Sequence, residues 1–232
     1  PSFNNAGTFT KSNGATNDES YFDVAFNNTG TVNVKKGTLT LAGGGTNTKT
    51  FSIDTGATLR IYGVDYNFNT GSSLTLAGNL VVDSATLKSS SGFNSTAAIS
   101  VNYGTLDIGG ASAWSGPLTV TGSTLTGAGA LTISSKLNWS DGTIAGTGKK
   151  TISGALNLSG YPYLDGTTLE TSGATTWTGA GSLYGYNSAI WNNTSTGTID
   201  LQGDADFRLS SGTTSFNNAG TFTKSNGATN DE

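Results

Sequence analysis

The chain has 232 residues, of which only 11% are charged, and its formal net charge is −4. It contains 34 Gly and no Cys, Met or His, which excludes disulfide bonds, thiolate or imidazole metal sites and His-dependent catalysis. The acidic balance argues against nucleic-acid binding, which needs a basic face. No run of about 18 apolar residues is present to span a membrane.

One segment of eighteen residues, SFNNAGTFTKSNGATNDE, occupies positions 2–19 and again positions 215–232. Phe3 of the first copy thus recurs as Phe216 of the second, and an identical match of this length indicates a repeated unit rather than chance. We expect residues 1–213 to form one unit of a tandem array and residues 214–232 to begin the next copy. The alternative is an engineered duplication of one end.

Short alternating segments recur along the chain, each with two large apolar residues on either side of one polar residue. In chain order they are residues 30–34, 37–41, 57–61, 73–76, 104–108, 116–120, 130–133, 154–158 and 197–201. A period of two places the apolar pair on one face of a strand. The many Gly and β-branched residues disfavour helix. Pairs such as Asp141-Gly142 and Asp165-Gly166 predict tight corners between strands.

An aromatic residue followed by Asn is a second recurring feature, as at Phe3 and Phe26 and again at Phe68 and Phe93. Both intervals are roughly 20–25 residues, which is typical of one coil of a β-solenoid. The strands share one pattern, two inward apolar residues followed by a Gly corner, which favours stacked coils over a sandwich or barrel. We therefore predict an all-β fold, a parallel β-helix or β-solenoid of roughly ten coils without a capping domain. At about 4.8 Å per coil, one unit would advance about 48 Å.

The strings FNNTGTVNVKKGTLTLAGGG (residues 26–45) and GTLDIGG (residues 104–110) resemble the β-strand repeats of large secreted bacterial surface proteins. The nearest families are autotransporter passenger domains and filamentous-haemagglutinin-like adhesins. The resemblance implies a right-handed parallel β-helix, export to the cell surface and a role as stalk, fibre or adhesin. These families share no catalytic residues that could be carried over to this chain.

Paired acids are the main candidates for chemistry. General acid and base groups must reach one substrate bond, whereas most acids here stand singly along the chain. Asp204 and Asp206 fall on one strand face, but Ca²⁺ needs six to eight oxygen ligands. A solvated surface pair is the simpler interpretation, and we predict neither a catalytic nor a metal site, and no cofactor.

Aromatic residues gather in the last third of the chain and suggest a carbohydrate-binding surface. Exposed rings can stack on sugars, and the candidate ligand-binding residues are Tyr161, Tyr163, Trp177, Tyr184, Tyr186 and Trp191. The alternative is that these rings fill the interior of the solenoid or stack on one another along it.

These features together predict a structural, extracellular β-solenoid unit of a long repetitive cell-surface protein or filament. Its partners would be identical neighbouring units, end to end, because uncapped solenoid ends present unpaired backbone groups. The second hypothesis is an adhesin stalk or passenger that also binds surface glycans through the aromatic region. The third is a polysaccharide-acting β-helix enzyme. We expect no nucleic-acid partner and no membrane insertion of this segment.

Overall fold

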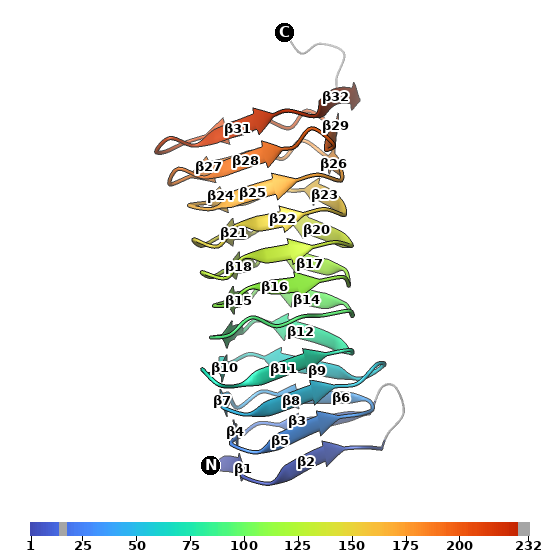
Figure 1. Ribbon diagram of the computed structural model, residues 1–232, viewed down its shortest axis with the longest axis vertical. Coiled ribbons are helices and arrows are strands. Elements are labelled where there is room, and N and C mark those ends of the chain that lie inside the picture. Colours follow the sequence, from blue (N-terminus) through green and yellow to red (C-terminus); the bar gives the residue numbers. More distant parts are fainter. Residues whose placement is uncertain (14–17, 227–232) are drawn as a thin grey trace.

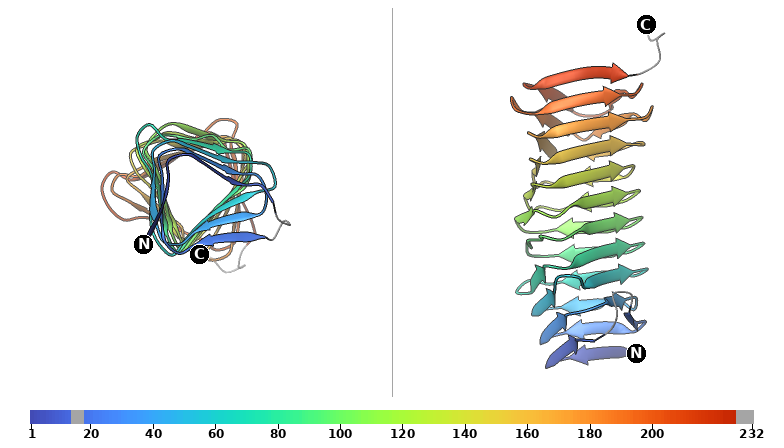
Figure 2. Two further views of the ribbon diagram at one scale, coloured as in Figure 1. Left: turned by 90° about the horizontal axis from the view of Figure 1, so that it is seen from below. Right: turned by 90° about the vertical axis from the view of Figure 1, so that its right-hand side faces the viewer.

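The computed structural model describes residues 1–13 and 18–226, and within these ranges the chain forms a parallel β-solenoid of about eleven coils without helices. The coils stack from β1 to β32 along the long axis of the molecule (Figure 1). Viewed along that axis, the backbone traces a triangle (Figure 2). Each side of the triangle is one parallel sheet, which we call sheet A, B or C. The predicted fold class is thus confirmed. The roughly ten coils were expected for one unit of 213 residues, and the structure also includes the start of the second copy.

The chain visits the sheets in the order A, B, C in every coil. Sheet A contains β1 (Ser2–Asn5), β4 (Ala25–Asn28), β7 (Gly45–Asn47), β10 (Tyr66–Phe68), β13 (Thr86–Ser89), β15 (Thr105–Ile108), β18 (Thr124–Thr126), β21 (Thr143–Ala145), β24 (Tyr163–Asp165), β27 (Leu183–Tyr186) and β30 (Phe207–Leu209). Sheet C contains β3 (Glu19–Phe22), β6 (Thr38–Leu41), β9 (Thr58–Tyr62), β12 (Asn79–Asp83), β14 (Ile99–Asn102), β17 (Leu118–Thr121), β20 (Lys136–Ser140), β23 (Ala155–Ser159), β26 (Ala174–Thr178), β29 (Thr198–Gln202) and β32 (Thr221–Asn226).

Sheet B is divided into two parts. The first contains β2 (Thr8–Lys11), β5 (Thr31–Val34), β8 (Thr50–Ile53) and β11 (Ser73–Leu76). The second contains β16 (Ser112–Trp114), β19 (Leu131–Ile133), β22 (Lys150–Ile152), β25 (Thr168–Thr171), β28 (Ile190–Asn193) and β31 (Ser215–Asn218). Between the parts, Ser95 alone takes the place of a strand, through single-residue bridges to Leu76 and Trp114.

Coil length varies along the stack. Coil length is the number of residues between a residue and its in-register partner in the next coil. It is smaller in the middle, from Leu118 to Leu137, than near the end, from Trp191 to Phe216. Phe3 does pair with Phe26, as predicted. The interpretation of Phe68 and Phe93 as one coil is wrong, because Phe68 of sheet A pairs with Ser89. Phe93 instead precedes Ser95 at the interruption of sheet B, so the aromatic-Asn pattern does not mark a single face.

The core is a column of inward side chains from all three sheets. All nine strands predicted from alternation are present, and both apolar residues of each are buried. Aliphatic residues fill most of the middle coils, where Phe93, Trp114 and Trp139 are also buried, and rings of Phe, Tyr and Trp cluster toward both ends. The predicted corners are also confirmed, since Asp141, Gly142 and Gly166 have φ values of 61°, 78° and 57°.

Polar ladders run inside the stack beside the apolar column. Asn5, Asn28 and Asn47 form one ladder, in which Nδ2 of Asn5 donates to Oδ1 of Asn28 at 2.7 Å, and Asn28 donates to Asn47 at 2.5 Å. Lys150 occupies an inward position in register with Leu131 and Leu169. Its Nζ donates to the carbonyl of Gly148 at 2.6 Å, so the buried ammonium is held by backbone rather than by an acid.

Candidate functional site

Three of the predicted tyrosines come together on the outer face of sheet A. Tyr163 of β24 is in register with Tyr184 of β27, and their ring centroids are 5.2 Å apart with planes inclined by 16°. Tyr186 lies two residues further along β27, with its centroid 6.2 Å from Tyr163 and 6.4 Å from Tyr184. The three rings are therefore nearly parallel and form a tyrosine stack.

The tyrosine stack offers ring edges and hydroxyl groups more than open ring faces. Tyr163 is 37% exposed, and Tyr184 and Tyr186 are half-buried, because neighbouring rings cover part of each face. Arg208 of β30 is in register with Tyr184 and forms an ion pair with Asp206, at 3.0 Å. The tyrosine stack therefore belongs to the part of the candidate aromatic set that reaches the surface.

Tyr161 lies in the turn before β24 and is 54% exposed. Its backbone N–H donates to Oδ1 of Asp141 in the preceding coil, at 2.7 Å. Tyr161 is thus close in sequence to the tyrosine stack, but it projects from a corner rather than from the flat face. The carboxylate of Asp141 ties two coils together.

Trp177 and Trp191 are not surface residues, and their assignment to a glycan site is wrong. Trp177 of β26 is 0% exposed and Trp191 of β28 is 1% exposed, because both occupy inward positions of alternating strands. The indole N–H of Trp191 donates to Oγ1 of Thr171 at 3.0 Å. Both indoles pack around Phe207, with centroids 4.8 and 5.6 Å from it. The alternative interpretation, that such rings fill the interior, is confirmed for these two.

The first end of the stack carries an aromatic cluster on its outermost coil. Phe3, Phe9 and Phe22 come from three different sheets, and their centroids lie 5.2 to 5.8 Å apart. All three are only partly buried and rest on the fully buried Phe26. The first coil therefore presents apolar rings along the axis, where a further coil could cover them.

The second copy of the repeated segment lies at the other end. Its strand β31 pairs with β28, placing Phe216 over Trp191, Asn217 over Asn192 and Asn218 over Asn193. Nδ2 of Asn193 donates to Oδ1 of Asn218 at 2.7 Å, and Nδ2 of Asn217 donates to Oδ1 of Asn192 at 2.8 Å. Each residue of Phe-Asn-Asn thus has a matching partner in Trp-Asn-Asn below.

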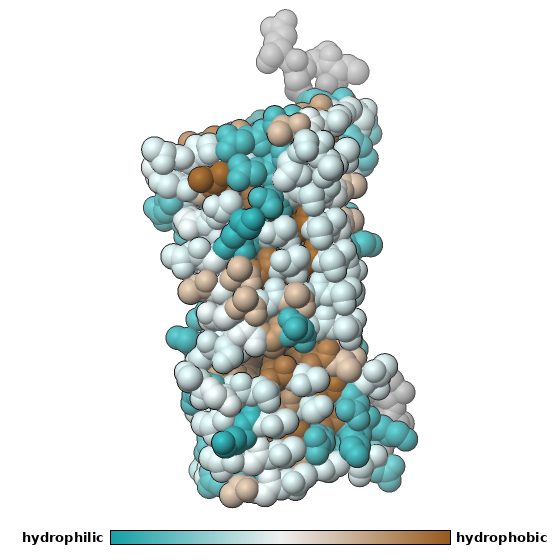
Figure 3. Space-filling model, viewed as in Figure 1, coloured by the Kyte–Doolittle hydropathy of each residue, from teal (hydrophilic) through white to brown (hydrophobic). Residues whose placement is uncertain are grey.

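The face seen in Figure 3 is mostly of intermediate hydropathy, with separate hydrophilic and hydrophobic patches. A hollow of about 360 Å³ lies at a corner beside Asp65, Ser84 and Tyr103, and another of about 410 Å³ lies over Leu74 and Phe93, at the interruption of sheet B. The carboxylate of Asp65 accepts the backbone N–H of Thr86 at 3.0 Å. Neither hollow brings together two acids, so no general acid–base pair is formed there.

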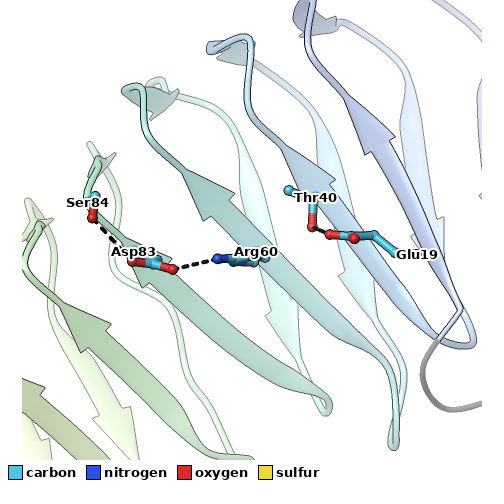
Figure 4. A network of polar contacts seen from close by, with 5 residues as sticks. All are labelled: Glu19, Thr40, Arg60, Asp83 and Ser84. Atoms are coloured by element: carbon cyan, nitrogen blue, oxygen red, sulfur yellow. Dashed lines mark hydrogen bonds and ion pairs between the residues drawn. The ribbon is translucent and has the colours of Figure 1, made fainter.

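Charged side chains on the outer face of sheet C connect successive coils (Figure 4). Arg60 of β9 donates to Asp83 of β12 at 2.6 Å, and its guanidinium lies 4.3 Å from the centre of the Tyr62 ring. Thr40 of β6 donates to the carboxylate of Glu19 in β3. Both contacts join neighbouring coils, and the partly exposed Arg60–Asp83 ion pair contributes up to about 1 kcal/mol.

The acids considered for Ca²⁺ are engaged in ion pairs. Asp204 lies 3.1 Å from Nζ of Lys224, and Asp206 pairs with Arg208. Within residues 1–13 and 18–226, no three acidic side chains are grouped so that they could hold a metal ion. The same part of the chain contains no helix with the length and apolar character needed to cross a membrane.

Sequence reasoning missed the asparagine ladders and the buried Lys150. The Phe-Asn-Asn pattern was visible, but its second Asn alternates with Phe on the same strand and so faces inward. Comparison of the chain with family models, curated proteins and solved structures found no match. The function must therefore be inferred from the fold, the tyrosine stack and the two ends.

Proposed function

We propose that this chain is a structural unit of a long, repetitive extracellular fibre in which copies of the unit stack end to end as one continuous β-solenoid. One observation carries the proposal: the repeated segment fits both ends of the stack. As residues 2–11 it lies under β4 and β5, and as residues 215–224 it lies over β28 and β29. Superposing the two copies would join the ends into one continuous stack.

The joined stack would satisfy the backbone across the junction. The carbonyl of Asn5 accepts the N–H of Thr29 at 2.9 Å, and the carbonyl of Asn193 accepts the N–H of Ala219 at 2.9 Å. Each ladder continues the parallel pairing of the sheets, so an internal copy would have no open strand edge at its ends. Open edges invite uncontrolled pairing, and covering them with the next copy removes that liability.

The composition supports a location outside the cell. The chain has no Cys or Met, the side chains most sensitive to oxidation. Its exterior is dominated by neutral Ser, Thr and Asn, with few charges. Such a surface keeps a long fibre hydrated, and the stacked core and ladders supply its stiffness.

Electron microscopy of the native material, together with a denaturing gel, tests this function. Continuous thin filaments with an axial repeat of about 50 Å are expected, from a coil spacing of about 4.8 Å. A very high denatured mass would identify a covalent array, and a mass near one unit would identify a head-to-tail polymer. Compact single particles without filaments would contradict the fibre.

A second candidate function is glycan binding by the tyrosine stack, as in an adhesin stalk. The observation that favours it is the gathering of three partly exposed rings on one outer face. Tyr184→Ala should abolish retention on a glycan array, whereas Tyr103→Ala, at an exposed corner outside the stack, should leave it unchanged. Equal retention of both variants, or none by the unaltered chain, would exclude the stack as a glycan site.

A further inference from the structure

The two copies of the repeated segment do not lie on the same faces of the solenoid. Ser2–Asn5 forms β1 in sheet A, whereas the identical Ser215–Asn218 forms β31 in sheet B. Likewise Thr8–Lys11 forms β2 in sheet B, and the second Thr-Phe-Thr-Lys lies in β32 of sheet C. Between the two copies the chain has therefore advanced by whole coils plus one face.

The count of strand positions gives the same result. Among the residues that the structure describes, thirty strands, β1 to β30, precede the second copy, and Ser95 fills one further position of sheet B through its two bridges. The unit thus has thirty-one positions, one more than ten turns of a three-sided coil. A unit of thirty positions would have kept its copies in phase.

Building on the fibre proposed above, we infer that each copy docks on the preceding copy with a rotation of one face, about a third of a turn. The partner is a second copy of this chain, and the docking surface consists of β28 and β29 on one side and β1 and β2 on the other. Residues on sheet A of one copy lie on sheet B of the next and on sheet C of the third.

Side chains on both sides of the junction fit this docking. In the assembled stack Trp191 would be followed by Phe216, which is the Phe3 of the next copy, and then by Phe26. The centroid distances of the two steps are 5.3 and 4.9 Å. The inward ladder would run from Asn193 through Asn218, the next copy's Asn5, with steps of 2.7 Å on either side.

At the adjacent corner, glycines of successive coils lie directly on one another and set how closely the coils approach. A Cβ on Gly220 would lie 2.1 Å from the carbonyl oxygen of Gly197, and a Cβ on Gly30 would lie 2.1 Å from that of Gly7. Gly7 and Gly220 are the same residue of the repeat, so the assembled column would be Gly197, Gly7 and Gly30. Only glycine allows this close backbone approach on both sides.

The rotation determines how surface features are displayed on a fibre. The tyrosine stack would appear on sheets A, B and C of successive copies, about 50 Å apart along the axis, and return to the first face after about 150 Å. A fibre of this unit would therefore present each patch on all three sides. Copies in phase would instead place every tyrosine stack on one side.

The first experiment uses cysteine pairs in this chain, which has no Cys of its own. Asn192 and Asn217 are outward and in register, so N192C/N217C should form a disulfide under mild oxidation, since paired strands lie about 4.8 Å apart. The matched control Y184C/N217C tests the alternative without rotation. In that arrangement the second copy would take the place of β30 and pair with β27 on sheet A. N192C/N217C should crosslink at least about tenfold faster, and faster crosslinking of the control would overturn the rotation.

The second experiment uses three tandem copies of the unit, residues 1–213, with Lys88→Cys in each. Lys88 of β13 is outward on sheet A, with its side chain 58% exposed. Gold labels should advance about 50 Å per copy along the axis and turn by a third of a revolution about it. The twist of the stack itself is measured with K88C/T126C, whose two labels lie two coils apart in one column of sheet A, and is subtracted. Labels in a straight row on a rigid rod would overturn the rotation alone. Separate beads without a rod would overturn the proposed fibre.

Discussion

The two copies of the repeated segment have identical residues but different surroundings. The first copy packs against Phe26, Val32 and their aliphatic neighbours, whereas the second packs against Trp191 and Ile199. Both keep Phe inward and in register with a buried apolar residue, although they lie on different sheets. Inward–outward alternation, and not the identity of the face, therefore fixes how a strand is placed in this solenoid.

The largest effect is expected from removing the aromatic residue in the coil next to each copy. Trp191→Ala and Phe26→Ala each delete a fully buried ring, and such changes cost about 3–5 kcal/mol. Because coils contact only their neighbours, Trp191→Ala should raise amide hydrogen exchange in β31 and β32 while leaving β1 and β2 protected. Phe26→Ala should do the reverse. Equal loss of protection at both ends would show that the two copies do not have separate supports.

The two copies also differ at a lysine on an inward position. Lys11 of the first copy is buried and pairs with Asp18 at 3.0 Å, whereas Lys224 of the second copy is exposed. Lys150 shows what full enclosure does, because burial lowers its pKa from 10.5 to about 8. Between those values the unfolded chain binds more protons than the folded chain, so stability rises with pH. The gain should reach up to about 3 kcal/mol from pH 8 to 10.5.

Lys150→Met tests that effect by removing the titrating group while preserving the volume beside Leu131 and Leu169. Urea unfolding midpoints should rise across this pH window for the unaltered chain and rise less for the variant. The difference between the two proteins is the quantity to compare, because contributions common to both cancel. Parallel curves would mean that the Lys150 ammonium is not destabilised by burial.

The two copies also differ in the space around their equivalent corner glycines, Gly7 and Gly220. Gly220→Ala would place Cβ 2.1 Å from the backbone of Gly197, whereas a Cβ on Gly7 meets nothing within 4 Å. Overpacking of this kind costs about 1–3 kcal/mol, so β32 should lose exchange protection in Gly220→Ala. Gly7→Ala should be almost silent in this chain, and comparable damage from both would contradict the pairing of Gly220 with Gly197.

The smallest effect is expected from the outward asparagines, which the two copies use in the same way. Asn4 accepts from Asn27 at 3.0 Å, and Asn217 donates to Asn192 at 2.8 Å. Both rungs are exposed to solvent, so Asn4→Ala and Asn217→Ala should each change thermal stability by less than about 0.5 kcal/mol. A large loss from only one of them would show that the outer ladder distinguishes the copies.

Much of the fold could be predicted from alternation, because each strand carries its own inward and outward pattern. The strand at residues 104–108 could be placed from its five residues alone. Alternation does not state which sheet a strand joins, so the rotation between copies and the mistaken Phe68–Phe93 coil could not be resolved from the sequence. Alternation also leaves open which of a strand's two faces points inward, so the inward Trp177 and Trp191 could not be separated from the outward tyrosines.

Lys150 shows a second limit of sequence reasoning. A charged residue in an alternating strand suggests solvent, yet this lysine stands in the column of Leu131 and Leu169. Its burial depends on carbonyl groups at glycine corners of successive coils, at Gly127, Gly129 and Gly148. Those corners come together only after the chain has coiled, so no local sequence pattern predicts that Lys150 is buried.

Mass per unit length, measured by scanning transmission electron microscopy on the native material, tests the continuous stack most directly. A chain of 23.5 kDa over 232 residues, wound into coils about 4.8 Å apart, gives about 0.4 kDa per Å for a single solenoid, or a whole multiple for bundled ones. That value is the expected result. A value well below it, with units spaced along an open thread, would contradict end-to-end stacking of the copies.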